Sequence, residues 1–397
     1  MGFYSEYLDR NLSFQQLTEE RKRMLARISE LRKRDILVYA ADVMKAPVAP
    51  VALAYDDLMP ITDQLQNLNG KALDMILETG GGSGETAEDI VRILRSKFES
   101  VAFIVPGIAK SAGTIMVMSG DEILMDANSA LGPIDAQIQY EGKQFSAEAL
   151  LKGFEKIKAE ADTTKSLNRA YIPLLQRISP GDLQHAENAL EFAKVLVTDW
   201  LFEHKYKKWN VHRTHNAGTP VTDDEKRVRA AKVASDLCDH SRWLTHGRSI
   251  RIQDLHALGV EVTDFSENKD LGEAIRRYHV LAQMMFNQTS IYKLIETPSS
   301  QIIRFMQTGA APLPAPGQPQ PGQPQEVLGV LADVQCPKCK KVHKVQVYFD
   351  TLKPLQTGVV RYPPNDMLVC DQCGTQINLA GMRQQLEMQT KRQVAKK

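Results

Sequence analysis

The sequence has few aromatic residues, almost no net charge and no long apolar run. Aromatic residues make up 7% of the 397 residues, and the formal net charge is +1. This charge balance argues against a polyanion-binding surface that covers the whole molecule. No run approaches the roughly 18 apolar residues of a membrane span, and the charged N-terminal stretch lacks the apolar core of a secretory signal. We therefore expect no membrane span and a cytoplasmic location.

Cysteine is also scarce, and its spacing is informative. Four of the five cysteines form two C-x-x-C pairs: Cys336 with Cys339, and Cys370 with Cys373. Each pair can present two thiolates to one tetrahedral zinc ion. Disulfide frameworks belong to oxidising compartments and rarely show this spacing. The sequence predicts a zinc ribbon with one structural Zn²⁺ held by these four cysteines.

A Pro/Gly/Gln-rich stretch, GAAPLPAPGQPQPGQPQ at 309–325, separates this ribbon from the rest of the chain. Proline every few residues favours an extended linker that cannot build a core. We predict four segments. They are an N-terminal helical segment at 1–34, an α/β domain at 35–308, the linker at 309–325, and the ribbon with a C-terminal helix at 326–397.

Apolar runs and amphipathic stretches alternate in the first half of the chain. We predict strands at 35–41, 73–78, 101–105 and 122–125, and helices at 13–34, 55–68, 85–98 and 114–118. Short apolar runs linked by helices indicate buried strands of a mostly parallel sheet. Further on, we expect helices within 146–178, 182–206 and 223–237, then strand, helix and strand within 241–262. Residues 270–308 fit either one long helix or a helix followed by a hairpin.

Two glycine-rich turns follow successive predicted strands. The first is TGGGSG at 79–84, and the second, GIAKSAGT, carries Ser111 at the start of a helix. Ligands of parallel sheets bind at this edge. Serine would only cap the helix if it stood alone, but two turns in register favour a nucleophile. Amides of Gly81 or Gly82 and of Ala112 would then form an oxyanion hole.

The stretches GGGSGETAEDI and VPGIAKSAGTIMVMSGDEILMDANSALGPIDAQI resemble the serine dehydrogenase proteinase family of Clp-fold serine peptidases. These are relatives of signal peptide peptidase A and ClpP. The resemblance spans about 35–264 and is strongest over 73–138. It implies a ClpP/crotonase-like spiral of βα units, a serine peptidase with Ser111 as nucleophile, a peptide or protein substrate, and a homo-oligomer.

The base that would activate Ser111 is less clear. Asp135 stands roughly where Clp-type enzymes have a histidine. Relatives with a Ser-Lys dyad favour a downstream lysine, and we place Lys152 first, by its separation from Ser111, and Lys158 second. A rebuilt triad is the third option: His185 or His246, with Asp236 or Asp239. Lys110 is interpreted as a charge at the surface or at the rim of the site.

Two other functions remain open. The first is a catalytically silent Clp-fold scaffold whose basic ribbon binds protein or nucleic acid. The second is a crotonase-like enzyme that uses the same oxyanion hole on a thioester. A serine endopeptidase that works through a Ser111 acyl-enzyme is the leading hypothesis.

Overall fold

The computed structural model describes residues 2–140, 143–212, 217–306, 329–349, 359–390 and 393–395. The chain divides into two compact units, Met1–Ala310 and Ala311–Lys397. The predicted linker at 309–325 lies outside the described residues. Within the described ranges, no helix is both long and apolar enough to cross a membrane.

A seven-stranded sheet forms the centre of the N-terminal unit, with the order β11-β10-β1-β2-β3-β5-β9. Its strands are β1 (Asp35–Ala41), β2 (Ala72–Glu78), β3 (Ser100–Ile104), β5 (Glu122–Met125), β9 (Thr263–Asp264), β10 (Ile291–Glu296) and β11 (Gln301–Phe305). The strands from β1 to β9 run parallel, and the β10–β11 hairpin pairs antiparallel with β1. Every residue of β1 after Asp35 is buried, as its apolar run predicts.

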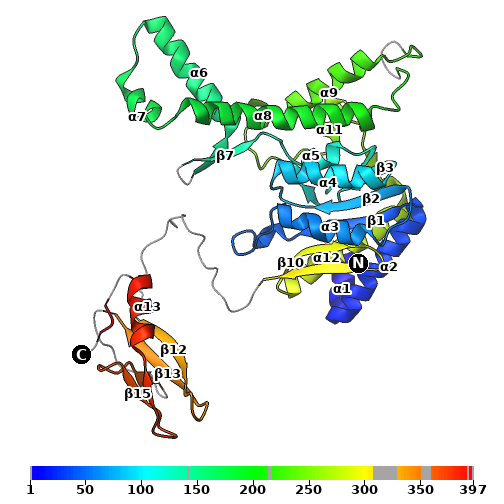
Figure 1. Cartoon of the computed structure of the whole chain (residues 1–397). Helices are drawn as coiled ribbons and strands as arrows, with labels where there is room; N and C mark the ends of the chain where they lie inside the picture. The colour runs from blue at the N-terminus through cyan, green and yellow to red at the C-terminus, as the bar shows by residue number, and fades with distance from the viewer. Residues whose placement is uncertain are drawn as a thin grey trace. The chain divides into compact units, whose positions relative to one another are not determined.

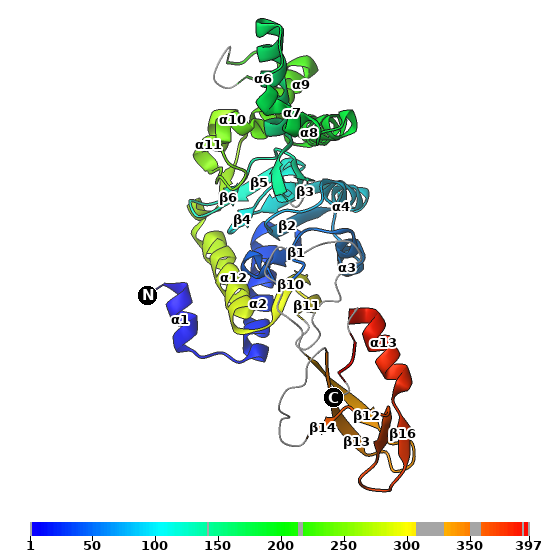
Figure 2. The same ribbon diagram turned by 90° about the vertical axis from the view of Figure 1, so that its left-hand side faces the viewer.

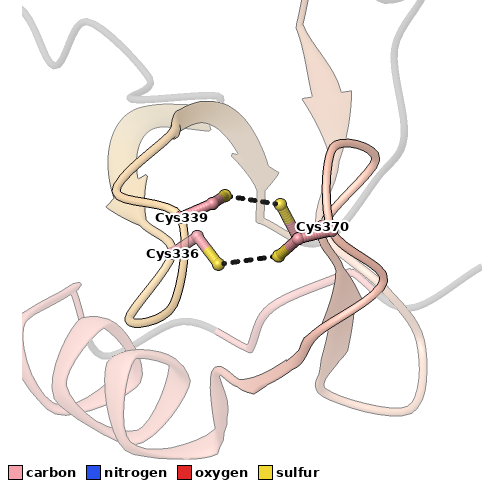
Figure 3. Close-up of side chains that lie close together, drawn as sticks. Cys336, Cys339 and Cys370 are labelled. Atoms are coloured by element: carbon pink, nitrogen blue, oxygen red, sulfur yellow. Dashed lines mark hydrogen bonds between the residues drawn. The ribbon is translucent and has the colours of Figure 1, made fainter.

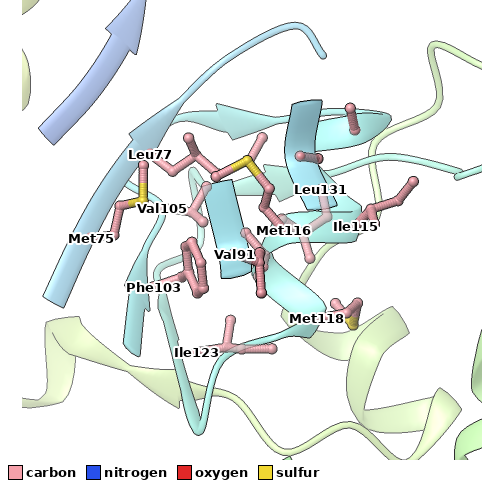
Figure 4. Close-up of a cluster of buried hydrophobic side chains, with 14 of the residues drawn as sticks. Met75, Leu77, Val91, Phe103, Val105, Ile115, Met116, Met118, Ile123 and Leu131 are labelled. Atoms are coloured by element: carbon pink, nitrogen blue, oxygen red, sulfur yellow. The ribbon is translucent and has the colours of Figure 1, made fainter. Parts of the chain in front are cut away.

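Helices cover both faces of this sheet (Figures 1 and 2). Ile36 and Val38 of β1 face a core shared with α2 (Phe14–Arg32) and α12 (Lys269–Gln288). Leu37 and Tyr39, on the opposite face, join α3 (Leu58–Leu65), α4 (Gly84–Lys97) and α5 (Ala112–Met118). Figure 4 shows part of this second core, where Met75, Leu77 and Phe103 meet Met116. The alternation of faces along β1 is the two-residue period of a strand.

A second, helical layer follows β5 in the sequence. After the short hairpin of β7 (Gln137–Tyr140) and β8 (Lys143–Ser146), it contains α6 (Ala147–Thr164), α7 (Ile172–Leu175), α8 (Pro180–Trp200), α9 (Asp223–Cys238), α10 (His240–Trp243) and α11 (Ile252–Leu258). In Figure 1, α6 and α7 extend away from the central sheet. The shorter elements of this unit are α1 (Phe3–Asp9), β4 (Ile108–Ala109) and β6 (Ala130–Leu131), together with brief 3₁₀ turns and a π-helical turn, Leu201–Lys205.

Most predicted elements are present, with shifts of a few residues at their ends. Ser13 and Gln16 form the expected capping box of α2. The ambiguous stretch 270–308 is a helix followed by a hairpin, as the second interpretation held. The strand expected at the start of 241–262 is wrong. Asp239 accepts hydrogen bonds from the amides of Ser241 and Arg242, and this cap begins α10 instead.

The C-terminal unit has its own small core. A three-stranded sheet, β12 (Gly329–Gln335), β13 (Val342–Tyr348) and β14 (Val360–Arg361), accompanies the hairpin β15 (Met367–Val369) and β16 (Gln376–Asn378) and the helix α13 (Ala380–Thr390). Val345 and Val347 alternate inward along β13, where they pack with Phe349, Tyr362 and Leu368. Both hairpins that carry a C-x-x-C pair, β12–β13 and β15–β16, therefore contribute side chains to this core.

Candidate active site and metal centre

The two glycine-rich turns lie side by side at the carboxyl edge of the sheet. The amide of Thr79 donates to the carbonyl of Ile108 at 2.9 Å, and the amide of Lys110 donates to the carbonyl of Thr79 at 3.0 Å. Thr79 and Ala109 form an isolated parallel bridge. The parallel order of β2 and β3 therefore brings the glycine turn to the segment that carries Ser111, as expected for neighbouring parallel strands.

Ser111 has a strained backbone and an unengaged side chain. Its φ is 51° and its ψ is −118°, outside the regions that L-residues normally occupy. Such a conformation costs about 1–3 kcal/mol and is most common at active sites. Ser111 stands at the N-cap position of α5, yet its side chain makes no capping hydrogen bond. The Ser111 hydroxyl therefore does not cap α5.

Gly81 and Gly82 allow close approach of two backbones. Both have positive φ, 106° and 152°. A Cβ at Gly81 would lie 2.7 Å from the Ser111 Cβ, and one at Gly82 would lie 2.3 Å from the Leu53 carbonyl oxygen. A side chain at either position would push the glycine turn away from Ser111 or from the segment around Leu53.

Two amides near Ser111 have no acceptor among the described residues. Gly81 donates its N–H to the Thr79 hydroxyl at 3.1 Å. The amides of Gly82 and Ala112 make no hydrogen bond to any described residue. Ala112 is the first residue of α5, where the helix dipole favours negative charge. Of the three predicted oxyanion contacts, Gly82 and Ala112 therefore have free donors, and Gly81 does not.

These groups line one cavity of about 850 Å³. Its wall includes the glycine turn, Ser111 and Ala112, and apolar residues from three other segments, such as Val51, Ile134 and Phe192. Two histidines, His185 and His246, also line it. The cavity thus joins a strained serine, free amides and imidazole groups, with an otherwise largely apolar wall.

The two histidines differ in their partners. The His246 Nδ1 lies 2.7 Å from one carboxylate oxygen of Asp135, whose side chain is completely buried. The His240 Nδ1 lies 3.0 Å from the other oxygen. Burial alone would raise the pKa of Asp135, but hydrogen bonds from His246 and His240 hold it below its ordinary range. His185 is exposed, and its nearby carboxylate, Asp182, caps α8 instead.

The carboxylates suggested for His246 are occupied elsewhere. Asp236 pairs with Lys232 and Arg242. Asp239 caps α10. The partner of His246 is instead Asp135, the residue that stands near the histidine position of Clp-type enzymes. Both residues were noted in the sequence, but no local pattern indicated that Asp135 and His246 are partners.

The structure does not place the candidate lysines among the residues that line the cavity. Lys152 lies on α6, is 51% exposed, and contacts Glu148 at 2.5 Å and the Ser241 hydroxyl at 2.7 Å. Lys158 is 60% exposed and lies 3.9 Å from Glu155. Both side chains are therefore largely solvated, and both ammonium groups contact carboxylates of α6.

Residues 3–173 match the family model described as ClpP-like SDH-type serine proteinase, a match that covers less than half of the chain. Residues 3–173 belong to this family. The family resemblance and the ClpP-like α/β fold predicted from the sequence are therefore confirmed. His246 lies beyond the matched residues of the SDH-type segment, so its role depends on the geometry of the cavity.

Two curated proteins to which this chain is similar are the uncharacterized proteins MJ0137 and MJ1495 of Methanocaldococcus jannaschii. They are 27% identical over 192 residues and 29% identical over 190 residues, each match covering 48% of this chain. The matches cover 54% and 51% of those proteins, so the chain spans about half the length of each relative.

Solved structures of the 1510-N membrane-bound stomatin-specific protease are also similar. One matches with 14% identity and a TM-score of 0.31, covering 55% of this chain and 79% of that chain. Another, in complex with a substrate peptide, matches with 17% identity and a TM-score of 0.30, covering 53% and 68%.

The C-terminal unit brings its four cysteines together. The Cys336 and Cys373 sulfurs lie 3.6 Å apart, and those of Cys339 and Cys370 lie 3.5 Å apart. Figure 3 shows Cys336 and Cys339 of one C-x-x-C turn facing Cys370 of the other. All four sulfurs lie within 4.8 Å of one another. Four thiolates around zinc, at Zn–S distances of about 2.3 Å, stand about 3.8 Å apart, so the arrangement fits one tetrahedral ion.

His343 lies beside this cluster. Its Nε2 is 3.3 Å from the Cys370 sulfur, and its side chain is buried. In this position it can donate to a cysteine sulfur, a common way of stabilising a metal-bound thiolate. The four cysteines are sufficient for a structural site without it.

Proposed function

We propose that this protein is a serine peptidase in which Ser111 is the nucleophile, His246 the general base and Asp135 the group that orients His246. One observation carries this proposal: a strained serine with a free hydroxyl shares a cavity with a histidine whose other ring nitrogen contacts a buried carboxylate. A nucleophile, a base and an orienting acid are the three groups of a serine triad.

Each group has a distinct task in the proposed reaction. Because Asp135 engages the Nδ1 of His246, the Nε2 remains to take the Ser111 proton. The serine oxygen attacks the peptide carbonyl, and the oxyanion accepts hydrogen bonds from the Gly82 and Ala112 amides. The imidazolium then protonates the leaving amine, and the C–N bond breaks to leave an acyl-enzyme. Water, deprotonated by His246, hydrolyses the ester and regenerates Ser111.

Activity is measured with a fluorogenic peptide. Its sequence copies the site that the protein cleaves fastest in casein. We expect His246→Ala to lower kcat/KM about 10²–10⁴-fold, since it removes the base. His240→Ala is the matched control, because His240 contacts the same carboxylate but does not line the cavity. It should lower kcat/KM by less than about tenfold.

The lysine alternative is tested with the same peptide. Lys152→Met and Lys158→Met should leave kcat/KM within about twofold of wild type, because neither side chain lines the cavity. A loss in Lys152→Met as large as that expected for His246→Ala, with His246→Ala near wild type, would assign the base to the lysine. Turnover of an acyl thioester without any peptide hydrolysis would favour crotonase-like chemistry. No turnover and no covalent labelling of Ser111 would favour the scaffold.

We further propose that the four cysteines hold one structural zinc ion. The support is the near-tetrahedral spacing of the sulfurs and the small core of the C-terminal unit. Modules of this size usually need a metal or disulfides to fold. Zinc would supply folding free energy there and take no part in hydrolysis. Metal analysis of the purified full chain should give one zinc per chain, and Cys370→Ser should lose it.

A further inference from the structure

Lys110, the residue before Ser111, makes an unusual set of contacts. Its Nζ donates to the carbonyls of Leu131 and Arg248, both at 2.9 Å, and to the Ser249 hydroxyl at 3.1 Å. The Gly247 carbonyl lies 3.5 Å away. In the described part of the chain the ammonium has no carboxylate partner. It binds backbone carbonyls, and all of these except Leu131 belong to the turn 247–249.

The path of the Lys110 stem is fixed by a glycine. A Cβ at Gly132 would lie 2.7 Å from the Lys110 Cδ. The Gly132 amide donates to the Thr114 hydroxyl at 3.0 Å, and that hydroxyl donates to the Ala109 carbonyl at 2.7 Å. The stem therefore crosses a rigid part of the fold, and the ammonium can reach only a small region.

That region adjoins the proposed base. Ser111 follows Lys110 in the chain, and Gly247 follows His246. A single side chain thus connects the nucleophile segment to the turn that leaves His246. Beside this turn, Ile250 pairs with Leu131 through two backbone hydrogen bonds, of 3.0 and 2.9 Å, and the Arg248 amide donates to the Thr245 carbonyl at 3.1 Å.

We propose that Lys110 is a positioning residue that holds the 247–249 turn, and with it His246, at the correct distance from Ser111. This inference rests on the proposed function, because it requires His246 to be the base. A displacement of about 1 Å at such a base can cost about 100-fold in rate. Lys110 is thereby assigned a task other than that of a rim charge.

The central test is Lys110→Met with the fluorogenic peptide. We expect kcat to fall about 10–100-fold with KM within about twofold, because substrate contacts remain while the base is misplaced. Lys97→Met is the control. The Lys97 ammonium also binds a backbone carbonyl, that of Leu65, has no carboxylate partner in the described part of the chain, and does not line the cavity. This control should keep the wild-type kcat.

A double-mutant cycle separates positioning from any independent effect. A fluorophosphonate labels serine nucleophiles covalently, so slow rates can be followed over hours. If Lys110 acts through His246, Lys110→Met should slow labelling in the wild-type background and change it less than about twofold in the His246→Ala background. Equal losses in both backgrounds would overturn the inference.

A milder variant covers the case in which Lys110→Met does not fold. Ser249→Ala removes one acceptor of the ammonium, and we expect kcat to fall about fivefold, the equivalent of one typical intramolecular hydrogen bond. An unchanged kcat in this variant would then count against the inference. If His246→Ala itself keeps wild-type activity, the proposed function fails. If His246→Ala is slow and Lys110→Met is as fast as wild type, only the role of Lys110 fails.

Discussion

The chemistry proposed for Ser111 depends on a glycine beside it. Gly81 has a φ of 106°, and a Cβ added to it would lie 2.7 Å from the Ser111 Cβ. We expect Gly81→Ala to lower kcat/KM at least about 100-fold, because the new methyl group must displace the turn that aligns the Gly82 amide. Gly153→Ala is the control, since nothing lies within 4 Å of a Cβ there. A Gly81→Ala protein with wild-type activity would contradict the proposed oxyanion site.

Asp135 supports a second prediction at the same scale. Asp135→Asn keeps the size of the side chain but removes the charge that stabilises the imidazolium of His246. We expect kcat to fall about 100-fold or more with little change in KM. The measurement is steady-state hydrolysis of the fluorogenic peptide. A rise in KM with constant kcat would instead assign Asp135 to substrate binding.

At the residue scale, local sequence patterns identify some groups of the site and miss others. Ser111 and the glycines are recognisable because each turn follows a strand and contains its own small residues. His246 and Asp135 come from separate segments, and no local periodicity relates them. Asp135 lies in LGPID, where the Clp pattern has a histidine, so the pattern signals a departure without identifying its replacement. The sequence separation of Lys152 suggested a base, but α6 directs that side chain to Glu148.

Among the elements, the end of β2 carries a pH-sensitive contact. Glu78 accepts from the Ile108 amide at 3.2 Å and lies 3.5 Å from the His279 Nε2 on α12. Burial raises the pKa of Glu78 to about 8, and burial lowers the pKa of His279 to about 4. At neutral pH the carboxyl is therefore protonated beside a neutral imidazole, and it helps to hold the turn that leads to Ser111.

The sign of the pH effect follows from proton counts. Above about pH 6.5 both groups are unprotonated in the unfolded chain, while folded Glu78 keeps its proton up to about pH 8. The folded state binds more protons, so the free energy of unfolding should fall by about 1.5 kcal/mol between pH 6.5 and pH 8, where Glu78 is half ionised. Below pH 6.5 the depressed pKa of His279 acts in the opposite direction.

Glu78→Gln should remove this fall, because the amide does not titrate. Urea unfolding followed by tryptophan fluorescence measures it, since all three tryptophans, Trp200, Trp209 and Trp243, lie in the N-terminal unit. The difference between variant and wild type isolates Glu78 from other titrating groups. The same slope in both proteins would show that Glu78 is ionised in the folded state.

The elements themselves were largely predictable. Apolar runs such as 35–41 and 73–78 indicate strands that are buried on both faces of a sheet. The apolar residues of α4 recur at helical spacing, which predicts a helix. The start of 241–262 was not predictable, because its short polar and aromatic mixture has no period and the cap by Asp239 decides the structure. Pairing of the β10–β11 hairpin with β1 is a contact between chain segments far apart in sequence, which local pattern does not encode.

At the scale of the whole molecule, the two units have separate cores. Removal of zinc with a chelator should unfold the C-terminal unit, because its small core is insufficient alone. We expect loss of far-ultraviolet circular dichroism without a change in tryptophan emission, and Cys370→Ser should behave likewise without chelator. A shift in emission on chelation would contradict the separation of the cores.

Ser111 is the proposed nucleophile on which every other catalytic role depends, and covalent labelling tests this role directly. The protein is treated with a fluorophosphonate, and the adduct is counted by intact mass and located by peptide mapping. Ser83 is the matched comparison, because it also lines the cavity but its hydroxyl accepts from the Thr86 amide and caps α4. We predict one adduct, at Ser111, that is lost in Ser111→Ala and kept in Ser83→Ala. An adduct at another residue, or wild-type labelling of Ser111→Ala, would contradict the account.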